Sequence, residues 1–153
     1  MVYRSLAMIT VNDLSFSYEG GQREAITGLN FEIDRGEVFG FLGPSGAGKS
    51  TTQKVLIRLL QQYQGSVSVF DRNLKDWGPD YFEQIGVSFE FPTHFLKLTG
   101  IENLTYFSRL YGRPTHSPAL LLQWVGLQDD GRLRVSQYSK GMKNRLSVAR
   151  AAP

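Results

Sequence analysis

Two kinds of hydrophobic pattern divide the chain. Before residue 90, short segments alternate between apolar and polar side chains, and turn residues separate them. This pattern is typical of half-buried β-strands and predicts them at 8–16, 29–33, 66–70 and 85–89. The segment 37–42 is apolar almost throughout, which predicts a strand buried on both faces, as in a parallel sheet.

Helical periodicity appears once in the first half and dominates the second. Over residues 49–61, leucines and a valine recur on one face of a helix with a 3.6-residue period. Three further helices are expected after Pro92, and each has its own start signal: a capping box of Thr99 and Glu102, the pair Ser117 and Pro118, and Ser139. Gly126 ends the second of them. The sequence therefore predicts a mixed β and α/β region followed by a helical one.

Composition narrows the class of protein only slightly. A chain of 153 residues, 41% hydrophobic and 20% charged, is typical of one globular domain, or one domain with an added lobe. The net charge of +3 is too small to indicate nucleic acid, and the basic residues that gather after residue 131 are typical of a solvated face. The chain has no cysteine, which excludes disulfides and thiolate metal sites and fits the cytosol. No apolar run approaches the ~20 residues of a membrane span.

The most informative motif lies between the apolar segment 37–42 and the helix predicted at 49–61. Residues 43–50 read Gly-Pro-Ser-Gly-Ala-Gly-Lys-Ser, which fits the phosphate-binding pattern G-x-x-x-x-G-K-[ST]. A glycine-rich turn without a ligand would explain the glycines, but not the Lys-Ser pair that follows them. The sequence therefore predicts a phosphate-binding loop between a strand and a helix.

Each position of this loop has a chemical reason. Gly46 and Gly48 lack Cβ atoms, so the backbone can curl and direct its N–H groups at a phosphate. The helix N-terminus adds a partial positive charge. Lys49 is expected to bridge the β- and γ-phosphates, and the Ser50 hydroxyl is expected to bind Mg²⁺. ATP and Mg²⁺ are the expected ligands.

Three further segments extend the pattern. Tyr18 precedes the loop, although alone it is better explained as a packed edge-strand residue. A strand ending at Glu90 is followed by Leu-Thr-Gly-Ile-Glu-Asn-Leu at 98–104. Tyr-Ser-Lys-Gly-Met at 138–142 precedes a helix. In this order and with these gaps, the chain from about Met8 to Ala151 resembles the nucleotide-binding domain of an ATP-binding cassette (ABC) transporter.

The resemblance implies a fold and a set of site residues. The fold is an α/β P-loop NTPase of the ABC type, with an antiparallel β subdomain and a partial parallel core sheet at 1–90, followed by a helical subdomain at 91–153. The residues it places on the nucleotide are Tyr18, stacking on adenine, then Gly43, Pro44, Ser45, Gly46, Ala47, Gly48, Lys49, Ser50 and Thr51, and across a dimer interface Ser139 and Gly141. Ser50 and Glu90 would hold Mg²⁺. Simple helix capping is the alternative role of Ser139.

The chain departs from the family pattern in three ways. Glu90 stands where the family has glutamine, and the segment 138–142 matches the family's Leu-Ser-Gly-Gly-Gln signature only at Ser139 and Gly141. The family's next strand, which ends in Asp-Glu, and a later histidine are absent. We therefore expect a truncated domain that binds ATP at best, does not hydrolyse it alone, and is poorly soluble because its apolar strand lacks neighbours.

The resemblance also implies partners and a location. The expected function is the ATP-binding subunit of a transporter, with a slight preference for an exporter. It pairs with a second nucleotide-binding domain and with a transmembrane permease subunit at the inner face of the plasma membrane, and not with nucleic acid. The aromatic segment 91–98 is either an exposed contact for the permease or a buried seam. The alternatives are a soluble non-transport ABC ATPase, a P-loop GTPase or kinase, and a non-functional remnant.

Overall fold

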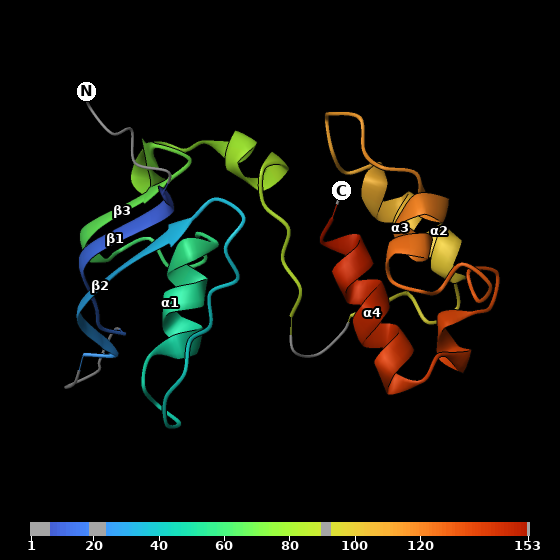
Figure 1. Cartoon of the computed structure of the whole chain (residues 1–153), viewed down its shortest axis with the longest axis horizontal. Coiled ribbons are helices and arrows are strands. Elements are labelled where there is room, and N and C mark those ends of the chain that lie inside the picture. Colours follow the sequence, from blue (N-terminus) through green and yellow to red (C-terminus); the bar gives the residue numbers. More distant parts are fainter. Residues whose placement is uncertain (1–6, 19–23, 90–92, 153) are drawn as a thin grey trace. The chain divides into compact units, whose positions relative to one another are not determined.

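The computed structural model describes residues 7–18, 24–89 and 93–152. The chain divides into two compact units, Met1–Gly78 and Pro79–Pro153. The first unit contains a β-sheet and one α-helix, and the second contains the remaining α-helices (Figure 1).

An antiparallel sheet forms the frame of the first unit. Its strands are β1 (Ala7–Phe16), β2 (Ile26–Asp34), β3 (Gln64–Val69) and β4 (Arg72–Asn73), in the order β2-β1-β3-β4. A short 3₁₀ helix, η1 (Leu74–Asp76), follows β4. The predicted strands at 8–16, 29–33 and 66–70 are confirmed by β1, β2 and β3. Their inward-facing side chains form the core, since Val11, Leu14 and Val67 are at most 1% exposed.

The middle of β1 is irregular where it passes the start of β3. Asp13 has a left-handed φ of 51°, and its amide donates a hydrogen bond of 2.9 Å to Asn30 Oδ1 on β2. Gly65 approaches this bulge so closely that a Cβ there would lie 2.2 Å from the Asp13 carbonyl oxygen. The position therefore requires glycine, because any side chain would push β3 away from β1.

The helix α1 (Lys49–Leu56) follows the glycine loop. Val55 and Leu56 are buried, as the periodicity predicts. The helix is shorter than the predicted 49–61, because Arg58 adopts a left-handed φ of 60° and ends the helical path. Leu59 is consequently 61% exposed instead of lying on the buried face.

The predicted strands at 37–42 and 85–89 are not formed. Phe39 and Phe41 pack on Phe31 of β2, with ring centroids 5.2 and 5.4 Å from the Phe31 ring. The side chains that flank these two rings face solvent, since Val38 is 98% and Leu42 95% exposed. A strand needs a neighbouring backbone to satisfy its N–H and C=O groups, and the part of the chain that the structure describes pairs no strand with either segment.

Helices make up the second unit. They are the 3₁₀ segments η2 (Pro79–Glu83) and η3 (Val135–Gln137) and the α-helices α2 (Gly100–Ser108), α3 (Pro118–Trp124) and α4 (Lys140–Arg150). The three predicted start signals are confirmed. Thr99 and Glu102 form both bonds of a capping box, and the Ser117 and Ser139 hydroxyls accept the amides of Leu120 and Met142.

These helices enclose a core of their own. Its buried members come from α2, α3, α4 and the segment between α3 and α4: Leu104, Leu121, Leu122, Leu127, Val135, Tyr138, Leu146 and Ala149. The segment before η3 runs antiparallel to the residues before α2, and an isolated bridge joins Thr99 to Arg134. No helix in the described ranges combines the length and hydropathy that crossing a bilayer requires.

Candidate functional site

The glycine loop at 43–48 adopts a backbone conformation that only glycine enters easily. Gly43, Gly46 and Gly48 have φ values of 151°, 81° and 82°. Gly48 is also the tightest position, because a Cβ there would lie 2.5 Å from the carbonyl oxygen of Ala25, the residue before β2. The loop is thus held against the start of β2. All three glycines suit their φ values, and Gly48 is required by space as well.

The N-terminus of α1 offers a cluster of unpaired donors. Gly48 is the N-cap in a left-handed conformation and provides no side-chain cap. Within the described part of the chain, the backbone amides of Gly48, Lys49, Ser50 and Thr51 have no hydrogen-bond acceptor. Such orphan amides, together with the helix dipole, are suited to an anion.

Lys49 places a positive charge over the same loop. Its ammonium donates to the carbonyl oxygens of Gly43 and Pro44 at 2.8 and 2.7 Å. An exposed carbonyl is a weak partner for a cation compared with a phosphate oxygen. The lysine is therefore positioned at the loop and can exchange these carbonyls for an anionic ligand.

A hollow of about 610 Å³ adjoins the loop and helix start. Among the described residues it is lined by Tyr18, Ala25 and residues 45–51, and none of these is acidic. Its size is that of a small-molecule site, and its charge, set by Lys49 and the free amides, is positive. The residues present therefore fit a phosphate-bearing ligand.

Tyr18 belongs to this hollow although it precedes the loop by a long stretch of sequence. Its hydroxyl shares a hydrogen bond of 3.2 Å with the hydroxyl of Thr51 in the first turn of α1. Its ring lies edge-to-face with Phe16 at a centroid distance of 5.0 Å, and the residue is 43% exposed. Nothing in the local sequence pattern signals the Tyr18–Thr51 bond, because it joins two separate elements.

The expected Mg²⁺ ligands are placed only in part. Ser50 is exposed at the second position of α1, next to the free amides, so its hydroxyl is accessible to an ion that accompanies a phosphate. Glu90, the other residue expected to hold the metal, lies outside the described residues. Across the described ranges, no three His, Cys, Asp or Glu side chains cluster as a metal site.

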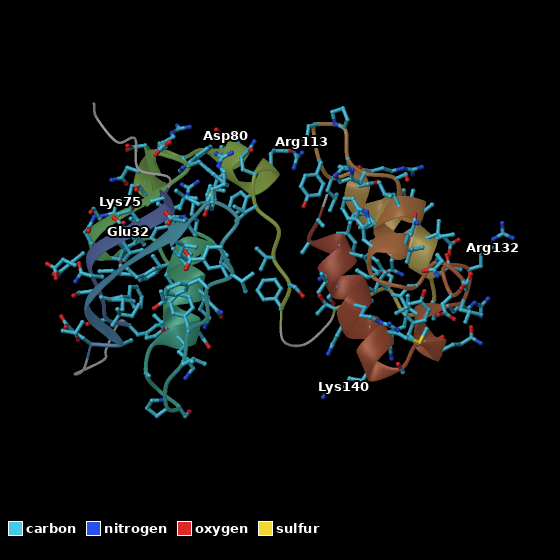
Figure 2. The ribbon with its side chains drawn as sticks, viewed as in Figure 1. Glu32, Lys75, Asp80, Arg113, Arg132 and Lys140 are labelled. Carbon is cyan, nitrogen blue, oxygen red and sulfur yellow. The ribbon has the colours of Figure 1, made fainter. Side chains whose placement is uncertain are left out.

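Ser139 and Gly141 lie in the second unit, at the start of α4. The Ser139 hydroxyl accepts the Met142 amide at 3.2 Å, so it caps the helix. Gly141 has no local need to be glycine, because the nearest atom to a Cβ there would be Ser139 Oγ at 3.9 Å. Lys140 between them extends from the helix end (Figure 2) and is exposed. This helix start is therefore both basic and accessible.

A polar cluster that the sequence did not predict fixes the segment before α2. His94 Nε2 lies 2.9 Å from the Lys143 carbonyl oxygen and 3.0 Å from Ser147 Oγ, both on α4. Arg150 donates a bond of 2.6 Å to the Thr93 carbonyl. Burial and the nearby cations lower the pKa of His94 below its ordinary value. These contacts could not be predicted from sequence, because a single histidine does not indicate which distant residues it will contact.

A glycine loop with free amides, a lysine folded over it and a helix with an uncapped N-terminus are the structural features of a P-loop. The model of the ABC transporter family matches residues 26–152. The chain therefore belongs to the ABC transporter family, and the resemblance inferred from its motifs is confirmed.

Named relatives agree with this assignment. The chain is 53% identical over 144 residues to the fluoroquinolones export ATP-binding protein of Mycobacterium tuberculosis, covering 94% of this chain and 48% of that protein. It is 33% identical over 145 residues to the bacitracin transport ATP-binding protein BcrA of Bacillus licheniformis, covering 94% and 47%. The chain thus spans about half the length of the curated relatives it matches.

Solved structures confirm the fold class. The structure of cbiO1 from Clostridium perfringens, part of the ABC transporter complex cbiONQ, superimposes with a TM-score of 0.84. Its sequence identity is 23%, and the match covers 95% of this chain and 61% of that one. An ATP-binding subunit of an ABC transporter superimposes with a TM-score of 0.76 at 30% identity, covering 94% and 61%.

Proposed function

We propose that this chain binds the phosphates of Mg·ATP in the glycine loop at 43–48 and at the N-terminus of α1. The observation that carries this proposal is the set of free amides at residues 48–51, with the Lys49 ammonium held beside them. In this role the amides and Lys49 bind the phosphate oxygens, and Ser50 is the protein ligand of Mg²⁺. Tyr18 contacts the base.

The larger role proposed is that of an ATP-binding subunit of a transporter. ATP bound here drives movement of a substrate through a transmembrane permease subunit, from the cytoplasmic side of the membrane. The names of the relatives support export, since one is a fluoroquinolones export protein and another a bacitracin transport protein. As the chain covers about half of each, these roles belong to the complete assembly.

Two further steps belong to the same proposal. The start of α4, with Ser139 and Gly141, contacts ATP held by the glycine loop of a second nucleotide-binding domain, because an exposed basic helix start suits an anion. The 153-residue chain alone binds ATP without efficient turnover, since no carboxylate among the described residues lines the hollow to orient a water molecule.

Calorimetric titration of the 153-residue chain with Mg·ATP tests this proposal. We expect Lys49→Ala to weaken binding at least about 100-fold, as expected for losing a charge-assisted contact and a loop anchor. Lys54→Ala is the matched control, because Lys54 is exposed in the last turn of the same helix, and it should bind like the unaltered chain. Equal affinity of Lys49→Ala and the control, or no binding by the unaltered chain, would contradict the proposal.

A further inference from the structure

Thr51 has two polar groups with different neighbours. Its backbone amide is one of the free donors at the start of α1, within the described residues. Its hydroxyl shares the 3.2 Å hydrogen bond with the Tyr18 hydroxyl. Thr51 itself is 8% exposed, so packing in the first turn of α1 limits the directions its side chain can take.

Tyr18, in contrast, has few other restraints. It lies two residues beyond the end of β1 and is 43% exposed, and its one ring neighbour among the described residues is Phe16. An exposed tyrosine beyond a strand end samples several rotamers, and fixing it costs conformational entropy. The bond to Thr51 fixes the ring before any ligand arrives, which is the physical basis of preorganisation.

We propose that Thr51 is a positioning residue that holds the Tyr18 ring for the nucleotide base, so that α1 determines both phosphate and base recognition. This inference rests on the proposed binding of ATP at the glycine loop. The two polar groups of Thr51 then have different roles. Its backbone amide binds phosphate, whereas its hydroxyl hydrogen-bonds Tyr18 and so affects only the base. Loss of the hydroxyl should thus affect ligands with a base more than ligands without one.

Two ligands distinguish these effects: Mg·ATP and magnesium tripolyphosphate, which has the charged chain but no base. Tyr18→Phe keeps the ring and removes only its hydroxyl. We expect the ratio of ATP affinity to tripolyphosphate affinity to fall about three- to tenfold, the usual worth of one neutral hydrogen bond. Thr51→Val, which keeps the shape and the amide, should lower the ratio equally, and Thr51→Ser should restore it.

A double-mutant cycle provides the sharpest readout. If one bond accounts for both losses, Tyr18→Phe combined with Thr51→Val should be no worse than either single variant. An unchanged or increased ratio in Tyr18→Phe would overturn the inference, the increase showing that the bond blocks the base. Strictly additive losses would overturn it as well.

The same titrations distinguish failure of this inference from failure of the proposed function. If the chain binds both ligands through Lys49, but Tyr18→Phe leaves the ratio unchanged, only the positioning role of Thr51 is wrong. If the unaltered chain binds neither ligand, both proposals are wrong. Far-UV circular dichroism of each variant establishes that the fold is retained.

Discussion

The helix in the first unit begins differently from the α-helices of the second. The starts of α2, α3 and α4 are each closed by a hydroxyl, from Thr99, Ser117 and Ser139, that accepts a backbone amide. The start of α1 has a left-handed glycine and no side-chain cap. Capping stabilises a helix by about 1 kcal/mol, and α1 forgoes this contribution. In the proposed function, the amides that a cap would occupy at the start of α1 are left for the phosphates of the ligand.

Among the substitutions that test this difference between the helix starts, Gly48→Ala is expected to have the largest effect, a loss of ATP affinity. The new Cβ would lie 2.5 Å from the Ala25 carbonyl oxygen, at a φ of 82° that disfavours alanine. The loop must therefore move, and the free amides lose their common direction. We expect ATP affinity measured by calorimetry to fall by about 100-fold or more, since several charge-assisted bonds are affected together.

Gly141→Ala is the matched control, because Gly141 lies in the first turn of α4 with open space around it. There alanine should leave the thermal unfolding temperature unchanged or raise it, as alanine has the higher helix propensity. If Gly48→Ala bound ATP as tightly as the unaltered chain, the proposed distinction between the two helix starts would be wrong.

A smaller effect is expected from removing a cap in the second unit. Ser117→Ala deprives the Leu120 amide of its acceptor at 3.3 Å. The free energy of unfolding should fall by about 1 kcal/mol, measured by urea denaturation, while ATP affinity stays the same. Ser117→Asp keeps an acceptor and should restore the stability. A Ser117→Ala variant as stable as the unaltered chain would show that this cap is dispensable.

The smallest expected effect is on the pH dependence of folding stability, to which the capping box of Thr99 and Glu102 contributes. Bonds from the Thr99 amide and hydroxyl lower the pKa of Glu102 below its ordinary value of 4.5. The folded chain therefore favours the ionised carboxylate. The stability that this carboxylate contributes is complete above pH 4.5 and is lost as the pH falls through the lowered pKa. We therefore expect the free energy of unfolding, measured by urea denaturation at pH 7 and pH 4, to change less with pH in Glu102→Gln than in the unaltered chain. An identical pH dependence in the two proteins would contradict this.

The features that the sequence predicted correctly are those with local causes. A helix start depends on a hydroxyl and an amide three residues later, so Thr99, Ser117 and Ser139 were identifiable from sequence. The glycine loop is also local, because its backbone conformation is set by three glycines. The family assignment followed from the order of such local motifs.

The features that escaped prediction depend on contacts between distant segments. The apolar segment 37–42 has the composition of a buried strand, but a strand is defined by its partner, which the described residues do not supply. The close approach of Gly65 to Asp13 and the bond between Tyr18 and Thr51 likewise join separate elements. Hydrophobic periodicity carries no information on such pairs.

The contact between Gly100 and Tyr138 limits which substitutions this chain can accept at the two positions. A Cβ on Gly100 would lie 2.3 Å from the Tyr138 hydroxyl oxygen, and that hydroxyl donates to the Asp130 carbonyl at 2.9 Å. The tyrosine thus occupies the volume that a side chain at position 100 would need. Substitutions at these two positions are therefore linked: a larger residue at 100 becomes tolerable only after position 138 has lost its phenol ring.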